Sequence, residues 1–155
     1  MSETFRIKTH SEEETKRLAA KLSRLLKAGD VITMEGDLGA GKTTFTKGLA
    51  EGLGVKRTVN SPTFTMIKQY QGELPLYHMD VYRLEESDED LGFDEYFHGE
   101  GISVVEWAQF IEDFLPDELL NINIMYEDEH TRMLEFTPKG THYKFVLNEL
   151  KASSI

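Results

Sequence analysis

The order of apolar and polar residues predicts a chain that alternates between strands and helices. After a short strand at 4–8, Ser11 is a residue typical of a helix N-cap, and three glutamates follow it where the helix dipole favours negative charge. Leucines recur at helical spacing from Leu18 to Leu26, and Gly29 is a natural residue to follow the helix. The pattern therefore predicts an amphipathic helix that ends near Gly29.

The rest of the chain divides into similar short segments. Further strands are expected at 31–35, 65–71, 74–80, 101–106, 120–126 and 132–137, with the pair 65–71 and 74–80 joined around Gly72. Further helices are expected at 42–53, 87–97 and 108–114, and a final segment at 143–150 has no assigned type. Residues 55–65 break both periods and contain Pro62, which predicts a loop.

A glycine-rich segment separates the strand at 31–35 from the helix that follows. Its spacing is G-x-x-x-x-G-K-T, with Gly36, Gly41, Lys42 and Thr43 at the fixed positions. Glycine lets successive backbone N–H groups curl around an anion, and the helix adds its positive N-terminal end. The lysine supplies a charge for phosphates, and the threonine hydroxyl is placed to bind Mg²⁺. A turn that merely meets a helix is the plainer interpretation, but the strand before and the helix after favour nucleotide binding.

A phosphate loop within alternating strands and helices predicts an α/β fold. We expect a P-loop NTPase-like sheet, mostly parallel with some antiparallel strands, flanked by helices on both faces. At 155 residues, the chain is expected to form a single domain, residues 1–155, with a real core.

Composition argues against a disulfide-rich, zinc-thiolate or membrane-spanning protein. Hydrophobic residues are 39% and charged residues 29% of the chain, which is typical of a globular protein. There is no cysteine, which excludes a disulfide framework and a thiolate zinc site. The sequence has no apolar run long enough to cross a bilayer, and its N-terminus lacks the apolar core of a signal peptide. We therefore expect a cytoplasmic protein without a membrane partner.

Acidic residues are concentrated in one part of the chain. The net charge is −11, and the 48 residues from Leu84 to Thr131 hold 16 acids but no lysine or arginine. Such a surface repels phosphate backbones, so the chain is not expected to hold a nucleic acid unaided. The window is either a solvated surface that aids solubility or a docking face for a basic partner.

Two acids and one hydroxyl are candidates for chemistry around the phosphates. Asp80 and Glu106 each end an apolar run, and open α/β sheets place their sites at the carboxyl ends of strands. The loop segment Ser61-Pro62-Thr63-Phe64 places a hydroxyl where P-loop switch enzymes sense the γ-phosphate, although such residues more often form turns.

Several nucleotide-binding classes do not fit. The guanine-reading motifs and the Asp-x-x-Gly switch of GTPases are missing, and the arginines of a kinase lid are missing from the region where a lid is expected. The five histidines show no metal-binding spacing, so His10, His98, His130 and His142 are expected on the surface, and His78 near the site at most. A P-loop kinase of a small metabolite and a nucleotide-binding regulatory module remain as alternatives to an ATPase.

Four segments together resemble one family. GDLGAGKTTFTKGL, SPTFT, YHMDVYRL and SVVEW resemble the TsaE family, small bacterial P-loop ATPases needed to make threonylcarbamoyladenosine in tRNA. The matches span roughly residues 35–107 in the family's order and spacing. The resemblance implies ATP and Mg²⁺ as cofactors and low turnover without partners. It also implies that the protein acts together with the threonylcarbamoyl transferase subunit and its inactive paralogue. These partners would hold the tRNA.

The resemblance also implies roles for individual residues. Asp80 and Lys42 would assist hydrolysis, with Thr63 as a sensor, and Thr43 and Glu106 would serve Mg²⁺. The residues expected to bind the nucleotide are Asp37, Leu38, Gly39, Ala40, Gly41, Lys42, Thr43 and Thr44 at the phosphates, Trp107 beside the site, and Arg132, Thr9 and Ser11 at the adenosine end.

Overall fold

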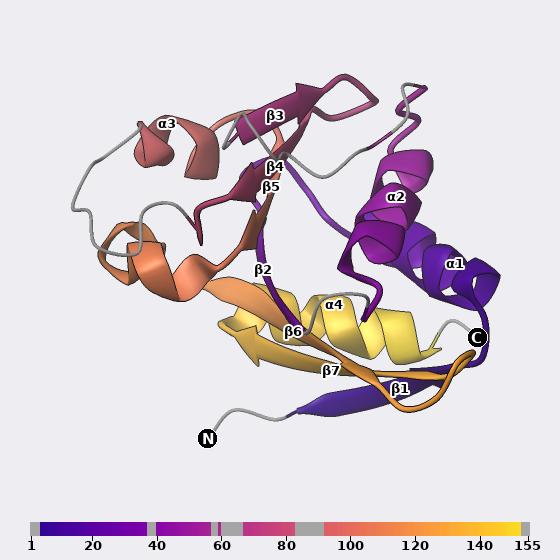
Figure 1. Cartoon of the computed structure of the whole chain (residues 1–155). Helices are drawn as coiled ribbons and strands as arrows, with labels where there is room; N and C mark the ends of the chain where they lie inside the picture. The colour runs from indigo at the N-terminus through magenta and orange to yellow at the C-terminus, as the bar shows by residue number, and fades with distance from the viewer. Residues whose placement is uncertain (1–3, 37–39, 57–58, 60–66, 83–91, 153–155) are drawn as a thin grey trace.

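The chain folds as one mixed sheet with helices on both faces (Figure 1). The computed structural model describes residues 4–36, 40–56, 59, 67–82 and 92–152. The strands are β1 (Phe5–Thr9), β2 (Val31–Gly36), β3 (Ile67–Tyr70), β4 (Leu76–Asp80), β5 (Ile102–Glu106), β6 (Leu119–Tyr126) and β7 (Arg132–Lys139). The helices are α1 (Glu12–Ser23), α2 (Lys42–Gly52), α3 (Phe93–Phe97), the 3₁₀ segment η2 (Ala108–Phe114) and α4 (Thr141–Ala152).

The strand order in the described sheet is β1-β7-β6-β2-β5-β4-β3. The four central strands β6, β2, β5 and β4 pair in parallel, whereas β3 and β7 pair antiparallel with their neighbours and β1 pairs antiparallel with β7. Five strands therefore run in one direction. The α/β fold and the partly antiparallel sheet predicted from the sequence are confirmed.

Pairing register brings the functional ends of three strands together. In the parallel ladders, Asp80 of β4 lies opposite Glu106 of β5, and Glu106 lies opposite Met34 of β2. Gly36 ends β2 at the same edge, directly before the phosphate loop. The carboxyl ends of these parallel strands meet at one edge of the sheet, where such sheets place their sites.

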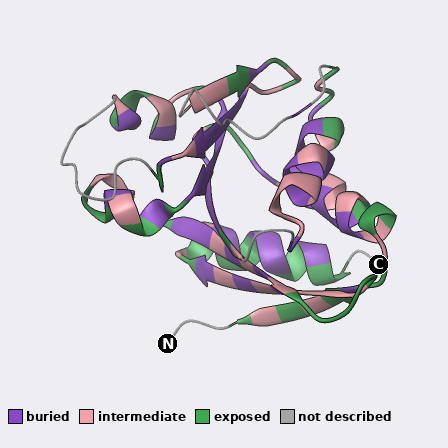
Figure 2. Cartoon of the chain, viewed as in Figure 1, coloured by how far each residue is buried: buried purple, intermediate pink, exposed green. Residues whose placement is uncertain are grey.

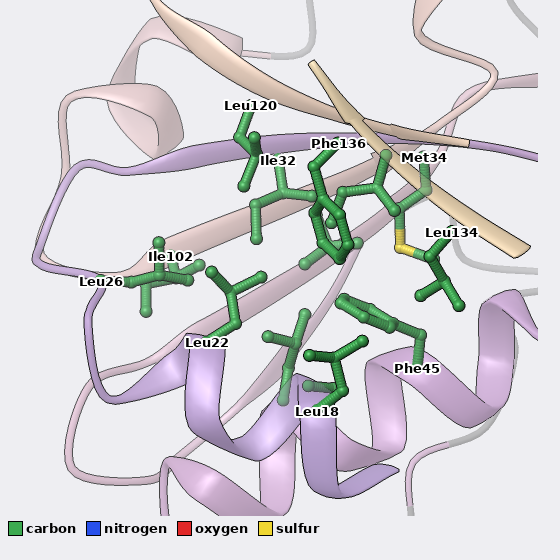
Figure 3. Packing of buried hydrophobic residues seen from close by; sticks show 14 of the residues in the cluster. Leu18, Leu22, Leu26, Ile32, Met34, Phe45, Ile102, Leu120, Leu134 and Phe136 are labelled. Atoms are coloured by element: carbon green, nitrogen blue, oxygen red, sulfur yellow. The ribbon is translucent and has the colours of Figure 1, made fainter. Parts of the chain in front are cut away.

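Apolar side chains form one cluster on each face of the sheet. On one face, α1, α2 and α4 pack against the strands, and Figure 3 shows Leu18, Leu22 and Phe45 pointing toward the strand residues. On the other face, the short α3 and η2 cover a smaller cluster that includes Phe93, Phe97 and Ile111. Figure 2 shows the central strands β2, β4 and β5, which lead to the site, as mostly buried.

Most predicted elements are present, with shifts at their ends. Ser11 caps α1 as predicted, since its hydroxyl oxygen accepts a hydrogen bond from the Glu14 N–H at 3.1 Å. The predicted end near Gly29 is wrong, because α1 stops at Ser23, whose hydroxyl bonds back to the Ala20 carbonyl. Gly29 instead has φ +90° in the turn before β2.

Other boundaries follow from tertiary packing or fall outside the described residues. The segment expected as a helix at 108–114 is a 3₁₀ helix, kinked at Ile111. Of the helix expected at 87–97, residues 87–91 lie outside the described residues and Phe93–Phe97 is helical. Residues 65–66 of the expected strand at 65–71 also lie outside them. The unassigned segment at 143–150 is helical, because Tyr143, Val146 and Leu150 face the core at helical spacing. No helix in the described ranges is long and apolar enough to span a membrane.

Candidate functional site

The phosphate loop starts where the backbone of β6 leaves no room for a side chain. Gly36 has φ +153°, and a Cβ there would lie 2.6 Å from the Ile124 carbonyl oxygen. Gly41, just before α2, has φ +114°, in the left-handed region that favours glycine. Two of the motif's glycines are therefore required by backbone conformation and by close approach. Of the residues between them, 37–39 lie outside the described part of the chain.

The first turn of α2 presents unpaired donors to the same edge. Gly41 occupies the N-cap and has no side chain to accept from the helix, and no acidic residue follows in the first turn. The first N–H groups of α2 have no helical acceptor, and the helix dipole places partial positive charge there. Lys42, Thr43 and Thr44 are the first residues of this turn, so the loop and the helix end form a site suited to an anion.

Three side chains meet where β5 ends, beside the first turn of α2. Glu106 is buried, its Oε1 lies 3.6 Å from the Lys42 Nζ, and its Oε2 lies 2.6 Å from the His78 Nε2. Burial alone would raise the pKa of the Glu106 carboxyl, but contacts with His78 and with the Lys42 ammonium outweigh it and hold the pKa below its ordinary value. Glu106 is therefore an ionised carboxylate at neutral pH.

Asp80 lies beside Glu106 with part of its side chain accessible. One of its carboxylate oxygens accepts a hydrogen bond from the Tyr82 N–H at 3.1 Å. Asp80 is half-buried and lines the same cleft as Lys42, so a water or a ligand in the cleft can reach it.

Trp107 borders the site in a strained conformation. Its φ is +64°, a value that large side chains rarely adopt. The Lys42 Nζ lies 5.5 Å from the centre of its ring, within the range of a cation–π contact. Tyr82 contacts the indole edge-on and Phe110 stacks against it, so packing holds the ring at the rim of the cleft. Strain of this kind is often retained for function.

Arg132 fastens the β6–β7 turn to the phosphate loop. Its Nε donates to the Ala40 carbonyl at 2.9 Å, and one terminal nitrogen donates to the carbonyls of Asp128 and Thr131 at 2.7 and 3.0 Å. The guanidinium also lies over the Tyr126 ring, 4.5 Å from its centre. Most of its donors are thus engaged within the protein.

These elements enclose a cleft of about 910 Å³, large enough for a nucleotide. Its described lining consists of Ser11, Glu12, Glu13, Thr15, Gly36, Gly41, Lys42, Thr43, Thr44, Asp80, Glu106, Trp107, Glu129, His130 and Arg132. Lys42 and the motif's glycines in this lining suit an anion, and the acids at the start of α1 line the same cleft.

Comparison with known proteins agrees with this geometry. The family model described as Threonylcarbamoyl adenosine biosynthesis protein TsaE matches residues 9–134. The chain belongs to the TsaE family. The match contains the phosphate loop, both strand-end acids and Arg132, so the resemblance seen in four short segments extends over most of the chain.

Individual TsaE relatives are similar over nearly their whole length. The tRNA threonylcarbamoyladenosine biosynthesis protein TsaE of Bacillus subtilis (strain 168) is 58% identical over 144 residues, 92% of this chain and 91% of that protein. The protein of the same name from Treponema pallidum (strain Nichols) is 42% identical over 122 residues, 77% of this chain and 90% of that one. The crystal structure of Bacillus subtilis YdiB matches with a TM-score of 0.86 and 50% identity over 98% of this chain and 97% of that one.

The structure brings most of the predicted TsaE site residues together. The residues of the prediction that line the cleft are Gly41, Lys42, Thr43, Thr44, Asp80, Glu106, Trp107, Arg132 and Ser11. Ala40 is buried and contributes its carbonyl to Arg132. Thr9 is buried and its hydroxyl bonds to that of Thr15 at 2.7 Å, behind the described lining. Asp37, Leu38, Gly39 and Thr63 lie outside the described residues, so their predicted roles stay predictions.

His78 was expected near the site at most, and it lies there on β4. Its contact with Glu106 was not predicted, although His78 and Asp80 are two residues apart on one strand and so share a face. His130 was expected only on the surface, and it is exposed but also lines the cleft. His142, also expected on the surface, is half-buried and bonds to the buried Asp30 at 2.9 Å. Four further residues line the cleft without having been predicted there: Glu12, Glu13, Thr15 and Glu129.

Proposed function

We propose that this chain is a Mg²⁺-dependent ATPase subunit of the machinery that makes threonylcarbamoyladenosine in tRNA. The observation that carries the proposal is that Asp80 and Glu106, at the ends of parallel strands, line one cleft with Lys42 and the start of α2, whose N-cap Gly41 has no capping side chain. The relatives named for this modification support the biological role.

The anion-binding residues of the cleft suit the phosphates of ATP. The N–H groups at the start of α2 donate to phosphate oxygens, and Lys42 contributes a charge. Lys42 contacts Glu106 at 3.6 Å in this structure, so its ammonium group is already held at the place where phosphate charge arrives.

The residues present also suit Mg²⁺. This ion prefers oxygen donors, and it is commonly held by one or two carboxylates together with substrate phosphates. The Thr43 hydroxyl and the Glu106 carboxylate are such donors, and both line the cleft. When bound, the metal would neutralise charge on the phosphates during transfer.

Asp80 is suited to assist the attacking water. In hydrolysis, the water oxygen bonds to the γ-phosphorus, the bond to the bridging oxygen of ADP breaks, and the water proton leaves with a base or with phosphate. Asp80 would orient the water and accept a hydrogen bond from it, while Lys42 binds the oxygens on which charge develops. Thr63 is proposed as the γ-phosphate sensor, and Ser11 and Arg132 as the border of the adenosine end.

The acidic surface supports action with protein partners. The acids of the Leu84–Thr131 window that are described and exposed are Asp94, Glu95, Glu100, Glu112, Asp113, Asp117, Glu118, Glu127, Asp128 and Glu129. A surface of this charge fits a basic protein better than tRNA. We therefore propose the transferase subunit and its inactive paralogue as partners, with tRNA bound by them, and a cytoplasmic location.

One assay tests the proposed function against a kinase. The purified protein is incubated with ATP and Mg²⁺, alone, with the two partner subunits, and with a panel of small metabolites. Free phosphate that rises on addition of the partners supports the proposal. Phosphorylated metabolite without free phosphate supports a kinase, and no turnover under any condition supports a regulatory module.

A further inference from the structure

His78 lies entirely inside the protein and contacts the proposed metal ligand. It is 0% exposed, in the middle of β4, between the strand pairings with β3 and β5. Its Nε2 lies 2.6 Å from the Glu106 Oε2. A buried imidazole that contacts only apolar neighbours would be a core residue. The His78 ring instead contacts a carboxylate oxygen of a site residue.

The direction of this hydrogen bond follows from its partners. An ionised carboxylate only accepts, so the His78 Nε2 carries the proton and donates. The other ring nitrogen, Nδ1, has no hydrogen-bond partner among the described residues. The hydrogen bond to Glu106 therefore involves Nε2 alone.

The two oxygens of Glu106 consequently have different surroundings. Oε2 is held by His78 inside the protein, whereas Oε1 lies 3.6 Å from the Lys42 Nζ, and Lys42 lines the cleft. Without His78, the carboxylate would be free to turn about its last bond and to point either oxygen into the cleft.

We propose that His78 is a positioning residue that holds the Glu106 carboxylate so that Oε1 alone is presented to Mg²⁺ at the nucleotide. This inference rests on the proposed function, because it assigns a residue to the metal site. Outer hydrogen bonds of this kind orient metal ligands, and their loss typically weakens metal binding or activity by about 10- to 100-fold.

Two substitutions of similar polarity separate positioning from packing. In His78→Gln, the amide nitrogen reaches about as far as Nε2 and keeps a donor for Glu106, whereas in His78→Asn it falls short. The measurement is Mn²⁺ binding, followed by electron paramagnetic resonance, at saturating non-hydrolysable ATP analogue. We expect the Asn variant to bind Mn²⁺ about tenfold more weakly and the Gln variant to remain within about threefold of the parent.

Two measurements in EDTA serve as controls: nucleotide affinity, and the melting temperature, which shows whether each variant is folded. Because the inference concerns the metal alone, nucleotide affinity in EDTA is expected to be unchanged in both variants. Equal Mn²⁺ affinity in the parent and both variants would show that His78 is only a core residue. An equal loss in both would show that the donor is not the cause, and would also overturn the inference.

The parent protein supplies a test that needs no substitution. A long-range ¹H–¹⁵N spectrum of the metal-free protein must show a proton on the His78 Nε2. A bare Nε2 would overturn the inference even if the Asn variant does not fold. If the parent binds no Mn²⁺ with the ATP analogue, the proposed function fails, and the metal role of His78 fails with it. If the parent binds Mn²⁺ and the variants do so equally, only the role of His78 fails.

Discussion

Arg132 donates a hydrogen bond from its Nε to the carbonyl oxygen of Ala40, 92 residues earlier in the chain, at 2.9 Å. A phosphate cradle presents N–H groups to the anion, so its carbonyls must find donors elsewhere. Arg132 supplies such a donor, and its other contacts tie the same group to the turn between β6 and β7. The hairpin therefore holds one end of the phosphate loop in shape.

Replacing Arg132 by lysine is expected to weaken ATP binding. Lysine keeps the charge but does not reproduce the fork that reaches several carbonyls. Losing one charged hydrogen bond costs about 1.5–3 kcal/mol, so we expect ATP affinity, measured by calorimetry, to fall by about tenfold or more. Arg6→Lys is the matched control, because the exposed Arg6 on β1 pairs with Glu135 of β7 and neither residue lines the described cleft. Equal affinity in both variants would contradict the role given to Arg132.

Lys42→Ala is expected to abolish hydrolysis and to weaken ATP binding in a folded protein. A charged phosphate contact is worth on the order of 2–3 kcal/mol, which corresponds to a loss of affinity of roughly 30- to 150-fold. Lys47→Ala on the same helix is the control, since Lys47 does not line the described cleft. The measurements are ATP affinity and phosphate release. Parent-like values in folded Lys42→Ala would refute the phosphate contact.

Glu106 and Asp80 are expected to fail in different ways. Glu106→Gln should make nucleotide binding less dependent on Mg²⁺, because it removes a charged oxygen ligand. Asp80→Asn should lower turnover more than affinity, because a positioned water matters only for chemistry. ATP affinity with and without Mg²⁺, together with turnover in the presence of partners, distinguishes the two. Parent-like hydrolysis by both variants would show that the assignment is wrong.

Tyr143 is expected to limit stability at alkaline pH. Burial raises the pKa of Tyr143 to about 12, although the Val31 N–H that bonds to its hydroxyl at 2.9 Å lowers it in part. Because its pKa is raised, the neutral Tyr143 contributes fully to stability below about pH 10, the ordinary tyrosine pKa. This contribution is lost as the pH rises from there through the folded-state pKa.

Tyr143→Phe removes this loss but also leaves the Val31 N–H without its partner. We expect the variant to be less stable at pH 7 by about 1–3 kcal/mol, and the difference from the parent to shrink by about 2–3 kcal/mol between pH 10 and 12. Urea unfolding at each pH measures both effects. A constant difference across this range would rule out the buried titration.

Charge reversal tests the acidic surface as a docking face. The variant Glu112→Lys, Asp113→Lys and Asp117→Lys should associate more slowly with the transferase and its paralogue, with a flatter dependence on salt, because exposed charges mainly set association rate. The matched control reverses Glu51, Glu73 and Glu149, three exposed acids outside the window. Association rate is measured against ionic strength, and ATP binding should barely change. Equal rates and slopes in both variants would leave the window as a solvated surface only.

The sequence by itself determined the features that depend on neighbouring residues. The glycine and lysine spacing fixes the phosphate loop because left-handed φ values and a helix start are local requirements. Ser11 caps α1 because its hydroxyl needs only an N–H three residues later. The strand-end acids were visible because apolar runs end at them.

The tertiary structure decided the features that depend on residues far apart in the chain. Local pattern does not show that β4 pairs with β5 in a register that sets His78 close to Glu106, or that Arg132 reaches Ala40. The same is true of Trp107, which keeps a positive φ inside an aromatic cluster. These contacts arise only when the whole sheet forms, because no short segment gains enough by itself to order them.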